Sequence, residues 1–439
     1  MRRRAFLRTS AGLIAGTVGP GVWAVAKPAS DKRSFTVRPY RPGETFGKVT
    51  CVTPDDGFYL HTFYDICPFS PSQRYLAVTR FPFQDRQPNP GDTADVCVID
   101  LESHTIETVY MTKGWGFQLG ANLNWGRTDR HLYTNDLIDG RGVAVRLDLE
   151  TGEAKAFAGP MYHIAPDESS VIGFPLELMN STQFGYGVPV DWKNVPRLSV
   201  MASPDEGLWK TDLRTNQKQL LVSVADLYER IRDPQSLANM VCYLFHSKFN
   251  RQNTRIMEVF RAIPRATGRQ KLSVLTFKTD GSDIKLAIDH GLWSKGGHHP
   301  NWHPDGEHLI MNLRPHGNKL LFCEYRYDGS DFRVISEKHP GGGHPSITAD
   351  GKYLVTDAYS SEGVVPPNKE VPIRLLDTAA DEVEVVCHIY TLGRKGDLGR
   401  GTLRLDPHPA WSRDFKKVCF NGAPDGRRQV FIADLSGVL

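Results

Sequence analysis

The sequence lacks a marked excess of either charge. Its 439 residues include 53 Lys and Arg against 50 Asp and Glu, which gives a formal net charge of +3. This balance excludes a chain coated with positive charge for nucleic-acid binding, and equally a chain coated with negative charge. We therefore expect no nucleic-acid partner, although a local basic pocket is compatible with the composition.

The short motifs of several large enzyme classes are also missing. The chain contains no Gly-x-Ser-x-Gly elbow, no Gly-rich phosphate loop and no His-Glu-x-x-His helix. These motifs place a nucleophilic serine, the phosphates of a nucleotide and the zinc of a protease, respectively. Their absence disfavours serine hydrolysis and nucleotide use.

Long hydrophobic runs are missing beyond the N-terminus. There, Arg2-Arg3-Arg4-Ala5-Phe6-Leu7-Arg8 precedes a short apolar stretch rich in Gly and Ala, which ends in Ala24-Val25-Ala26. A basic start, a short apolar middle and a small-residue exit predict that residues 1–26 are a removable export signal of the twin-arginine type. We expect a periplasmic or secreted protein with no stable membrane span after cleavage. A retained N-terminal anchor is the alternative, and the short apolar run disfavours it.

Cysteines are few and show no metal-binding or redox spacing. No Cys-x-x-Cys pair occurs among the seven, and most lie in apolar runs such as Val418-Cys419-Phe420. We predict buried free thiols that pack as small apolar side chains. A disulfide between strands is the alternative in an oxidising compartment.

Helical periodicity is scarce. Only residues 224–240 place apolar side chains, at Leu227, Ile231 and Leu237, on one helical face. Elsewhere, alternating apolar and polar residues between turn residues predict strands, and hence an all-β fold.

An internal repeat shows how these strands are organised. In each copy the fourth position is apolar, a turn follows near the seventh and a β run near the eleventh. Four copies begin at His246, His299, His344 and His408, and weaker copies begin at Ile66, Asn122 and Met161. Repeats of roughly 40 to 60 residues are typical of propellers and solenoids rather than of independent domains.

A second recurrent pattern lies between these starts, with Asp95-Val-Cys-Val-Ile-Asp as one example. It reads as strand, polar turn and strand, which adds a second hairpin to each copy. Four antiparallel strands in each of seven copies predict a single-domain, seven-bladed β-propeller over residues 46–439. We expect residues 27–45 to be a linker and about 175–240 to contain an insertion.

The last copy lacks its outermost strand. The apolar segment 46–52 precedes the first copy and has no blade of its own. We predict that this N-terminal strand pairs with the last blade and closes the ring, which removes an exposed sheet edge. An open ring or a ring of six blades is the alternative.

The symmetry of a propeller predicts that the repeated histidines lie close together. Residues at one register position of each blade lie at one height around the axis, so His246, His299, His344 and His408 should converge in the channel. Clustered imidazoles are common transition-metal ligands, which predicts a divalent metal, zinc or manganese ahead of calcium. The alternative is that each histidine is a structural cap of its blade.

Other candidates flank the same mouth of the channel. They are His61, Tyr64, Asn122, Tyr186, Arg197, Arg255 and His298, and Arg261, Arg314 and Lys248 are further possible sources of positive charge. His298 follows two glycines, which let the backbone approach a ligand closely. Tyr186 and Arg197 lie in the long gap between the third and fourth copies. For each residue alone, a packed or solvated role is the competing interpretation.

At this point the sequence resembles a known group, the seven-bladed lyases that cleave uronate-containing chains. These are the oligogalacturonate lyases and, more closely, the ulvan lyases. The resemblance covers the whole mature chain. It depends on the residues 61–65 with 68–71, 118–120 with 125–126, 183–187, and the His-Pro pairs at 344 and 408.

The resemblance implies roles for the candidates. His299, His344 and His408 match the histidines that hold a metal in oligogalacturonate lyases, and His246 matches the base in chain order. Tyr186 and Arg197 look like the tyrosine and arginine of ulvan lyases, and His61 is a second candidate base. Tyr64, His298, Arg255 and Asn122 are expected to bind substrate. Asn122 departs from the pattern, since a channel histidine is expected there, which leaves the identity of the base open.

The expected activity is β-elimination on an acidic oligosaccharide or polysaccharide. Removal of the C5 proton of a uronate requires its carboxylate to be neutralised by a metal or an arginine. A histidine or tyrosine then takes the proton. A non-catalytic carbohydrate-binding or scaffolding propeller is the alternative. A glycosidase is disfavoured because no paired carboxylates recur in register.

Overall fold

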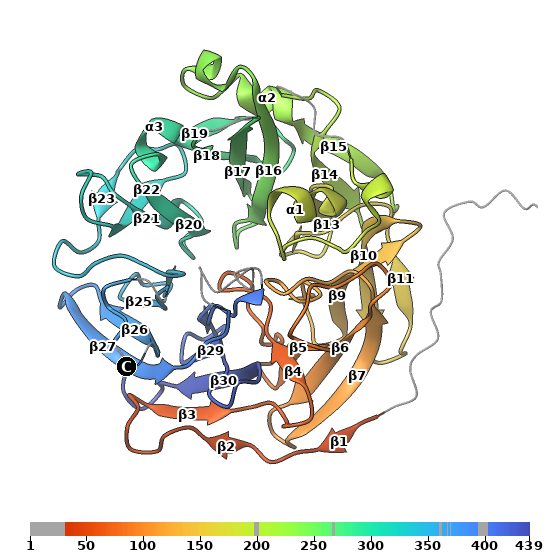
Figure 1. The fold of residues 1–439 in the computed structure, drawn as a ribbon, viewed down its shortest axis with the longest axis vertical. Helices are drawn as coiled ribbons and strands as arrows, with labels where there is room; N and C mark the ends of the chain where they lie inside the picture. Colours follow the sequence, from red (N-terminus) through yellow and green to blue (C-terminus); the bar gives the residue numbers. More distant parts are fainter. Residues whose placement is uncertain are drawn as a thin grey trace, which may run out of the picture.

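Seven antiparallel sheets surround a central axis in the computed structural model of this chain (Figure 1). The structure describes residues 31–196, 202–265, 268–359, 362–366, 368, 370–393 and 403–439. The export signal predicted at 1–26 lies outside these residues. The sheets confirm the prediction of an all-β, seven-bladed propeller.

Each of the first three blades follows the repeat, from the innermost strand outward. Blade 1 contains β4 (Phe58–Leu60), β5 (Tyr75–Phe81), β6 (Ala94–Asp100) and β7 (Thr105–Thr112). Blade 2 contains β8 (Asn124–Trp125), β9 (His131–Ile138), β10 (Arg141–Asp148) and β11 (Ala154–Ala156). Blade 3 contains β12 (His163–Ile164), β13 (Ser170–Gly173), β14 (Gly207–Asp212) and β15 (Lys218–Ser223).

The remaining blades repeat this order. Blade 4 contains β16 (Met240–Phe249), β17 (Arg255–Pro264), β18 (Lys271–Lys278) and β19 (Lys285–Ile288). Blade 5 contains β20 (Gly297–Trp302), β21 (His308–Leu313), β22 (Leu321–Arg326) and β23 (Arg333–Val334). Blade 6 contains β24 (Ser346–Ile347), β25 (Tyr353–Thr356), β26 (Val371–Asp377) and β27 (Glu382–Ile389).

Blade 7 joins the two ends of the chain. Its inner strands are β28 (Ala410–Trp411), β29 (Lys417–Gly422) and β30 (Gln429–Asp434). The fourth strand is β3 (Lys48–Cys51), which pairs antiparallel with β30 (Figure 1). The predicted closure of the ring is therefore confirmed. The segment expected to be a linker also adds strands, because β2 (Arg38–Pro39) pairs with β3 and β1 (Arg33–Ser34) pairs with β7.

Tryptophans at the fourth repeat position connect neighbouring blades. The indole Nε1 of Trp302 in blade 5 donates to Lys248 O in blade 4, at 3.1 Å. Trp411 in blade 7 donates to Ser346 O in blade 6 at 3.1 Å, and Trp125 in blade 2 donates to Pro68 O at 2.8 Å. A buried indole needs such an acceptor, so this register position fixes both the packing and the order of the blades.

The first repeat position carries an unusual backbone. His246, His299 and His408 have φ of 76°, 59° and 50°, and Asn122 in blade 2 has φ of 55°. The ladders of blades 4 and 5 shift register at His246 and His299, as in a β-bulge. His and Asn tolerate this left-handed region better than most residues. A bulge redirects the side chain at its position, which turns these side chains toward the channel.

The helices are short and lie in connections. These are α1 (Leu176–Thr182) and the 3₁₀ turn Trp192–Asn194 within blade 3, α2 (Val224–Tyr228) and the 3₁₀ turn Pro234–Leu237 before blade 4, and α3 (His290–Trp293) before blade 5. The single helix expected over 224–240 is wrong, because the left-handed φ of 53° at Asp233 and the following proline interrupt it. The segment 175–240 also includes β14 and β15, which are regular blade strands.

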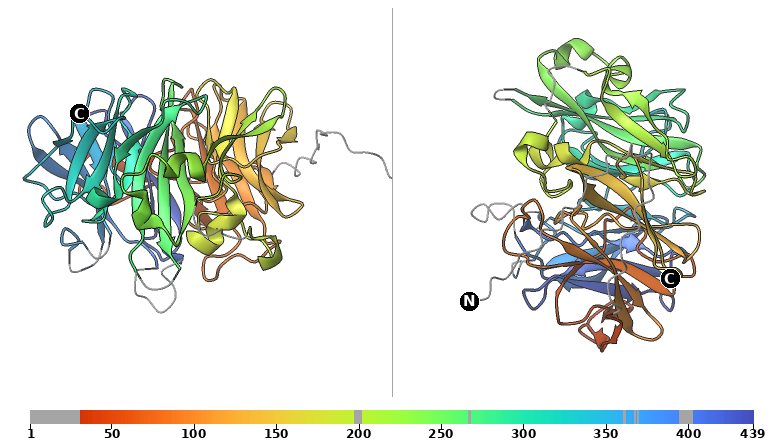
Figure 2. Two further views of the ribbon diagram at one scale, coloured as in Figure 1. Left: turned by 90° about the horizontal axis from the view of Figure 1, so that it is seen from above. Right: turned by 90° about the vertical axis from the view of Figure 1, so that its right-hand side faces the viewer.

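Seen from the side, the ring is a disc, and α1 projects from one of its faces (Figure 2). We call this the α1 face. All seven cysteines are free thiols, six of them buried. In the part of the chain that the structure describes, no helix has the length and apolar character needed to cross a bilayer.

Candidate functional site

Two aromatic side chains fill the centre of the channel. They are Phe63 and Tyr64, from the segment that follows β4. The ring of Phe63 lies 4.4 Å from that of His408 and 5.6 Å from that of His246, between centroids. The ring of Tyr64 lies 5.2 Å from that of His344 and 5.5 Å from that of His299. The four repeated histidines thus surround these two rings.

Three of the four histidines contact one another. The ring centroids of His299 and His344 are 3.8 Å apart, and those of His344 and His408 are 4.4 Å apart. His246 lies on the other side of Phe63, with Tyr64, Tyr162 and Phe245 around its ring. The predicted convergence therefore brings together His299, His344 and His408 and leaves His246 apart.

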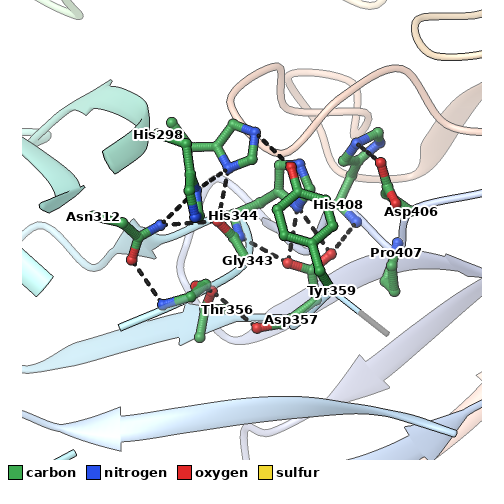
Figure 3. A network of polar contacts seen from close by, with 12 residues as sticks. His298, Asn312, Gly343, His344, Thr356, Asp357, Tyr359, Asp406, Pro407 and His408 are labelled. Carbon is green, nitrogen blue, oxygen red and sulfur yellow. Dashed lines mark hydrogen bonds and ion pairs between the residues drawn. The ribbon is translucent and has the colours of Figure 1, made fainter. Parts of the chain in front are cut away.

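A group of three donors could hold a metal ion at this point. One ligand atom from each of His344, Asp406 and His408 lies within 4.8 Å of the others (Figure 3). Nε2 of His344 and both ring nitrogens of His408 are buried without a hydrogen-bond partner among the described residues. Burying unpaired polar atoms is costly, and a bound cation would satisfy them. Sequence reasoning missed Asp406, although it lies two residues before a predicted ligand.

Asp357 orients both of these histidines. Its Oδ1 lies 2.9 Å from Nδ1 of His344, and its Oδ2 accepts from the backbone N–H of His408 at 3.1 Å (Figure 3). A proton on Nδ1 of His344 leaves the lone pair of Nε2 for a metal, which is the usual second-layer arrangement of carboxylate and histidine. Burial, followed by the charges of His344 and His61, keeps the pKa of His408 well below its usual value.

His299 is not part of this donor group, because both of its ring nitrogens form hydrogen bonds. Its Nδ1 lies 2.7 Å from Gly343 O, and its Nε2 lies 3.2 Å from the hydroxyl of Tyr359. His298 lies beside it, with its Nδ1 within 3.1 Å of the Asn312 amide (Figure 3). With both nitrogens of His299 in hydrogen bonds, the donor group contains Asp406 where the sequence predicted His299.

His246 is arranged as a neutral imidazole. Its Nε2 lies 2.8 Å from Oδ2 of Asp65, and Lys248 forms an ion pair with the same oxygen. Nδ1 has no hydrogen-bond partner in the described part of the chain. Burial, followed by the charges of Arg261 and His344, keeps the pKa of His246 well below its usual value. The sequence named Lys248 as a possible source of positive charge, but neither it nor Asp65 was predicted to pair with His246.

A cavity of about 380 Å³ opens between these groups, beside Gln183 at the end of α1. Its lining includes Phe63, Tyr186, His246, Arg261, His298 and His299. We call it the histidine cavity. Nη1 of Arg261 donates to the Gln183 side chain at 2.7 Å. In the described residues no carboxylate lies within ion-pair distance of Arg261, and its Nε is buried without a partner.

Tyr186 connects the histidine cavity with the metal-donor group. Its hydroxyl lies 3.5 Å from Nη2 of Arg404, and Nε of Arg404 donates to Asp406 at 2.8 Å. Burial raises the pKa of Tyr186, so the phenol stays protonated at neutral pH. Tyr186, which the sequence predicted at the channel mouth, lines the histidine cavity, whereas the sequence gave no indication of Arg404.

The remaining candidates lie outside the histidine cavity. His61 is fully buried, with Nε2 3.4 Å from Pro407 O, and burial lowers its pKa to about 4. Asn122 donates to Met161 O and Tyr162 O at 3.0 and 3.1 Å, which ties blade 2 to blade 3.

Arg255 points away from the channel. It donates to Asp283 at 2.8 Å and to the hydroxyl of Thr276 on the third strand of its blade. Its charge is thus neutralised within blade 4. Arg197 lies outside the described residues.

Comparison with known proteins supports the fold. No protein-family model matches this sequence, and no curated protein matches it. Among solved structures, it is similar to an oligogalacturonate lyase from Vibrio parahaemolyticus, with a TM-score of 0.66 and 16% identity over 93% of this chain and 98% of the other. It is also similar to an oligogalacturonate lyase in complex with manganese, with a TM-score of 0.64 and 18% identity over 92% and 98% of the two chains. At such identities, the likeness establishes the propeller fold alone.

Proposed function

We propose that this protein is a lyase that cleaves uronate-containing oligosaccharides by β-elimination in the histidine cavity. The observation that carries the proposal is that a neutral imidazole and an arginine without a carboxylate partner, His246 and Arg261, line one cavity. Elimination requires these two functions together, a base for the C5 proton and a positive charge for the adjacent carboxylate.

The donor group fits a divalent transition metal. His344, His408 and Asp406 would supply two nitrogens and one oxygen, a set suited to zinc or manganese. Manganese is the metal in the complex of the similar lyase. When bound, the ion would add positive charge beside the histidine cavity and so favour the anionic form of the substrate at C5.

Arg261 is the anchor that we assign to the substrate carboxylate. A guanidinium binds a carboxylate through two parallel hydrogen bonds, and the only side-chain hydrogen bond to Arg261 among the described residues is the one to Gln183. The sequence assigned this role to Arg197. Arg261 takes it here because it lines the cavity beside His246.

His246 is the residue that we assign as the base. With its Nε2 proton directed at Asp65, the lone pair of Nδ1 is left to accept the C5 proton. The electron pair of the C5–H bond then forms the C4=C5 double bond as the bond from C4 to O4 breaks. The protonated imidazole is stabilised by Asp65. Tyr186 is the proton donor to O4, since its phenol is kept protonated by burial.

The proposal also covers the substrate and the cellular compartment. The resemblance to solved oligogalacturonate lyases supports a galacturonate chain, while the sequence motifs point to ulvan. A substrate outside the cytoplasm would agree with the predicted export through the twin-arginine pathway. An acidic oligosaccharide is therefore the proposed partner.

The test is the absorbance of the unsaturated uronate product. Purified protein would be incubated with oligogalacturonate, ulvan and glycosaminoglycan fragments, with His246→Ala as the inactive variant and His308→Ala as a matched control. His308 is paired with Asp305 in the turn between the first two strands of blade 5 and does not line the histidine cavity. Absence of the chromophore with every substrate would refute the lyase.

A non-catalytic carbohydrate-binding propeller is the second candidate. One observation favours it: His344 and His408 are each only 1% exposed, and the ring of Phe63 lies against His408. A metal so enclosed would serve structure rather than chemistry. Tight binding of an acidic oligosaccharide without product would establish this alternative.

A further inference from the structure

A second cavity lies on the opposite side of the channel from the histidine cavity. Its volume is about 480 Å³, and it is lined where the innermost strands end and turn back. We call it the turn-side cavity. Tyr64 and Asp65 line it, whereas the neighbouring Phe63 lines the histidine cavity. The segment 63–65 therefore separates the two cavities, and the proposed lyase chemistry makes no use of this second one.

The lining of the turn-side cavity is strongly basic. Arg127, Arg251, Arg413 and Lys248 contribute to it, and Asp65 is the only carboxylate that does. In the described part of the chain no ion pair involves Arg127 or Arg251. Nε of Arg413 donates to the carbonyls of Phe69 and Ser70, at 3.1 Å each, which fixes the side chain and leaves its terminal nitrogens for a ligand.

Among the described residues, no carboxylate forms an ion pair with Arg127, Arg251 or Arg413. Asp129 accepts from Ser72, Glu168 accepts from the Tyr133 hydroxyl, and Asp414 accepts from the Ser412 hydroxyl. None of the three carboxylates lines the cavity. Arg251 stacks over the ring of Phe415, with its Cζ 5.4 Å from the centroid. The positive charge at this mouth thus remains available to a ligand.

Lys248 lies beneath the floor of the cavity. Its side chain is 2% exposed, its Nζ is buried, and within the described residues Asp65 is its single charged partner. Burial lowers the pKa of Lys248 well below its usual value. A negative charge held just above the floor would favour the protonated form of this lysine.

We propose that the turn-side cavity binds a small anion, a carboxylate or a tetrahedral oxyanion, whose charged end lies above the buried Lys248. Arg127 and Arg251 on the rim and the terminal nitrogens of Arg413 surround the same negative charge. Arginine and lysine around a concave site are the usual donors to carboxylate, sulfate and phosphate groups. The edges of Trp125, Trp302 and Trp411 form apolar walls for the rest of such a ligand.

Calorimetric titration tests this site without reference to turnover. Monomeric galacturonate, inorganic sulfate and inorganic phosphate would be titrated separately into the full-length mature protein at constant ionic strength. The three probes distinguish carboxylate from oxyanion specificity. The double variant Arg127→Ala, Arg251→Ala should weaken binding of the preferred probe about tenfold or more, because each lost charge-assisted hydrogen bond costs that much.

A matched variant separates a site from a general charge effect. Arg214 and Arg230 are exposed and lie in the outer part of blade 3 and the connection to blade 4. Arg214→Ala, Arg230→Ala removes the same charge and should change binding less than twofold. Equal weakening in both double variants, or no binding of any probe, would overturn the proposal.

Further variants separate this site from the proposed active site. Arg261→Ala in the histidine cavity should leave binding of sulfate and phosphate unchanged, because the proposed function gives Arg261 a role in uronate binding alone. Lys248→Met should weaken binding of the preferred probe in protein with an unchanged circular dichroism spectrum. Weakening by Arg261→Ala but not by the Arg127 and Arg251 changes would place the anion in the histidine cavity and refute the inference. The outcome is independent of whether any substrate is cleaved.

Discussion

His246 and Asp65 face each other across the channel, with Nε2 of the imidazole 2.8 Å from Oδ2 of the carboxylate. Asp65 belongs to the segment after the first strand of blade 1, and His246 to the innermost strand of blade 4. The contact fixes which nitrogen carries the proton and directs the other nitrogen away from the carboxylate. The first prediction depends on this arrangement.

His246→Ala should lower kcat/KM for the elimination by at least about 100-fold, since a positioned base contributes roughly that much. The measurement is the initial rate of product absorbance. Metal content should not change, because His246 lies outside the donor group of His344, Asp406 and His408. A variant that retains full activity would assign the proton transfer to another residue.

His344→Ala and His408→Ala should each remove most of the bound metal, as measured by elemental analysis of purified protein. Each change deletes a nitrogen that has no other partner. His299→Ala is the control and should keep its metal, because both nitrogens of His299 are already in hydrogen bonds. If metal content is unchanged in both donor variants, the proposed site does not exist.

Stability should fall as pH decreases from 7 to 5, partly because of buried neutral histidines. Burial lowers the pKa of His61 in the folded state to about 4, below the value of about 6.5 for an exposed histidine, so the unfolded chain binds its proton first as pH falls. The contribution of His61 to the free energy of unfolding is fully present above the pKa of the unfolded state and is lost as pH falls toward 4. We expect a loss of about 2 kcal/mol from His61 over this range.

The measurement is urea unfolding of metal-free protein at pH 7 and pH 5. His61→Asn removes the titrating group and keeps a side-chain donor toward Pro407 O. Its loss of stability between the two pH values should be smaller than that of the wild type by about the same 2 kcal/mol. An identical pH dependence in both proteins would contradict the assignment.

Val49→Ala should destabilise the fold by about 2 kcal/mol, because it opens a cavity in the core of the closing blade. Val49 is 2% exposed and pairs with Ala433 across β3 and β30. Chemical denaturation measures the change. Lys48→Ala on the same strand is the control, since Lys48 is exposed and should alter stability by less than about 0.5 kcal/mol. Equal effects would mean that ring closure contributes little.

The success of sequence reasoning differed between the ring and the site. The repeat fixed the blade count, the inner strands and the closing strand, because each of these follows from apolar alternation and turn residues within a few positions. The helix expected over 224–240 failed for a local reason, the left-handed Asp233 before Pro234. Among the site residues, the histidines were found because they recur, whereas Asp357, Arg404 and Asp406 occur once each and show no pattern.

By itself, the sequence determined a closed ring of seven sheets and the register that turns histidines toward its axis, because short-range periodicity encodes strands and repetition encodes symmetry. Only the tertiary structure decided which side chains fill the central channel. Phe63 and Tyr64 enter from blade 1 and divide the channel, and Asp65 meets His246 across 181 positions of sequence. Such contacts depend on where side chains meet after the ring has closed, which no local pattern records.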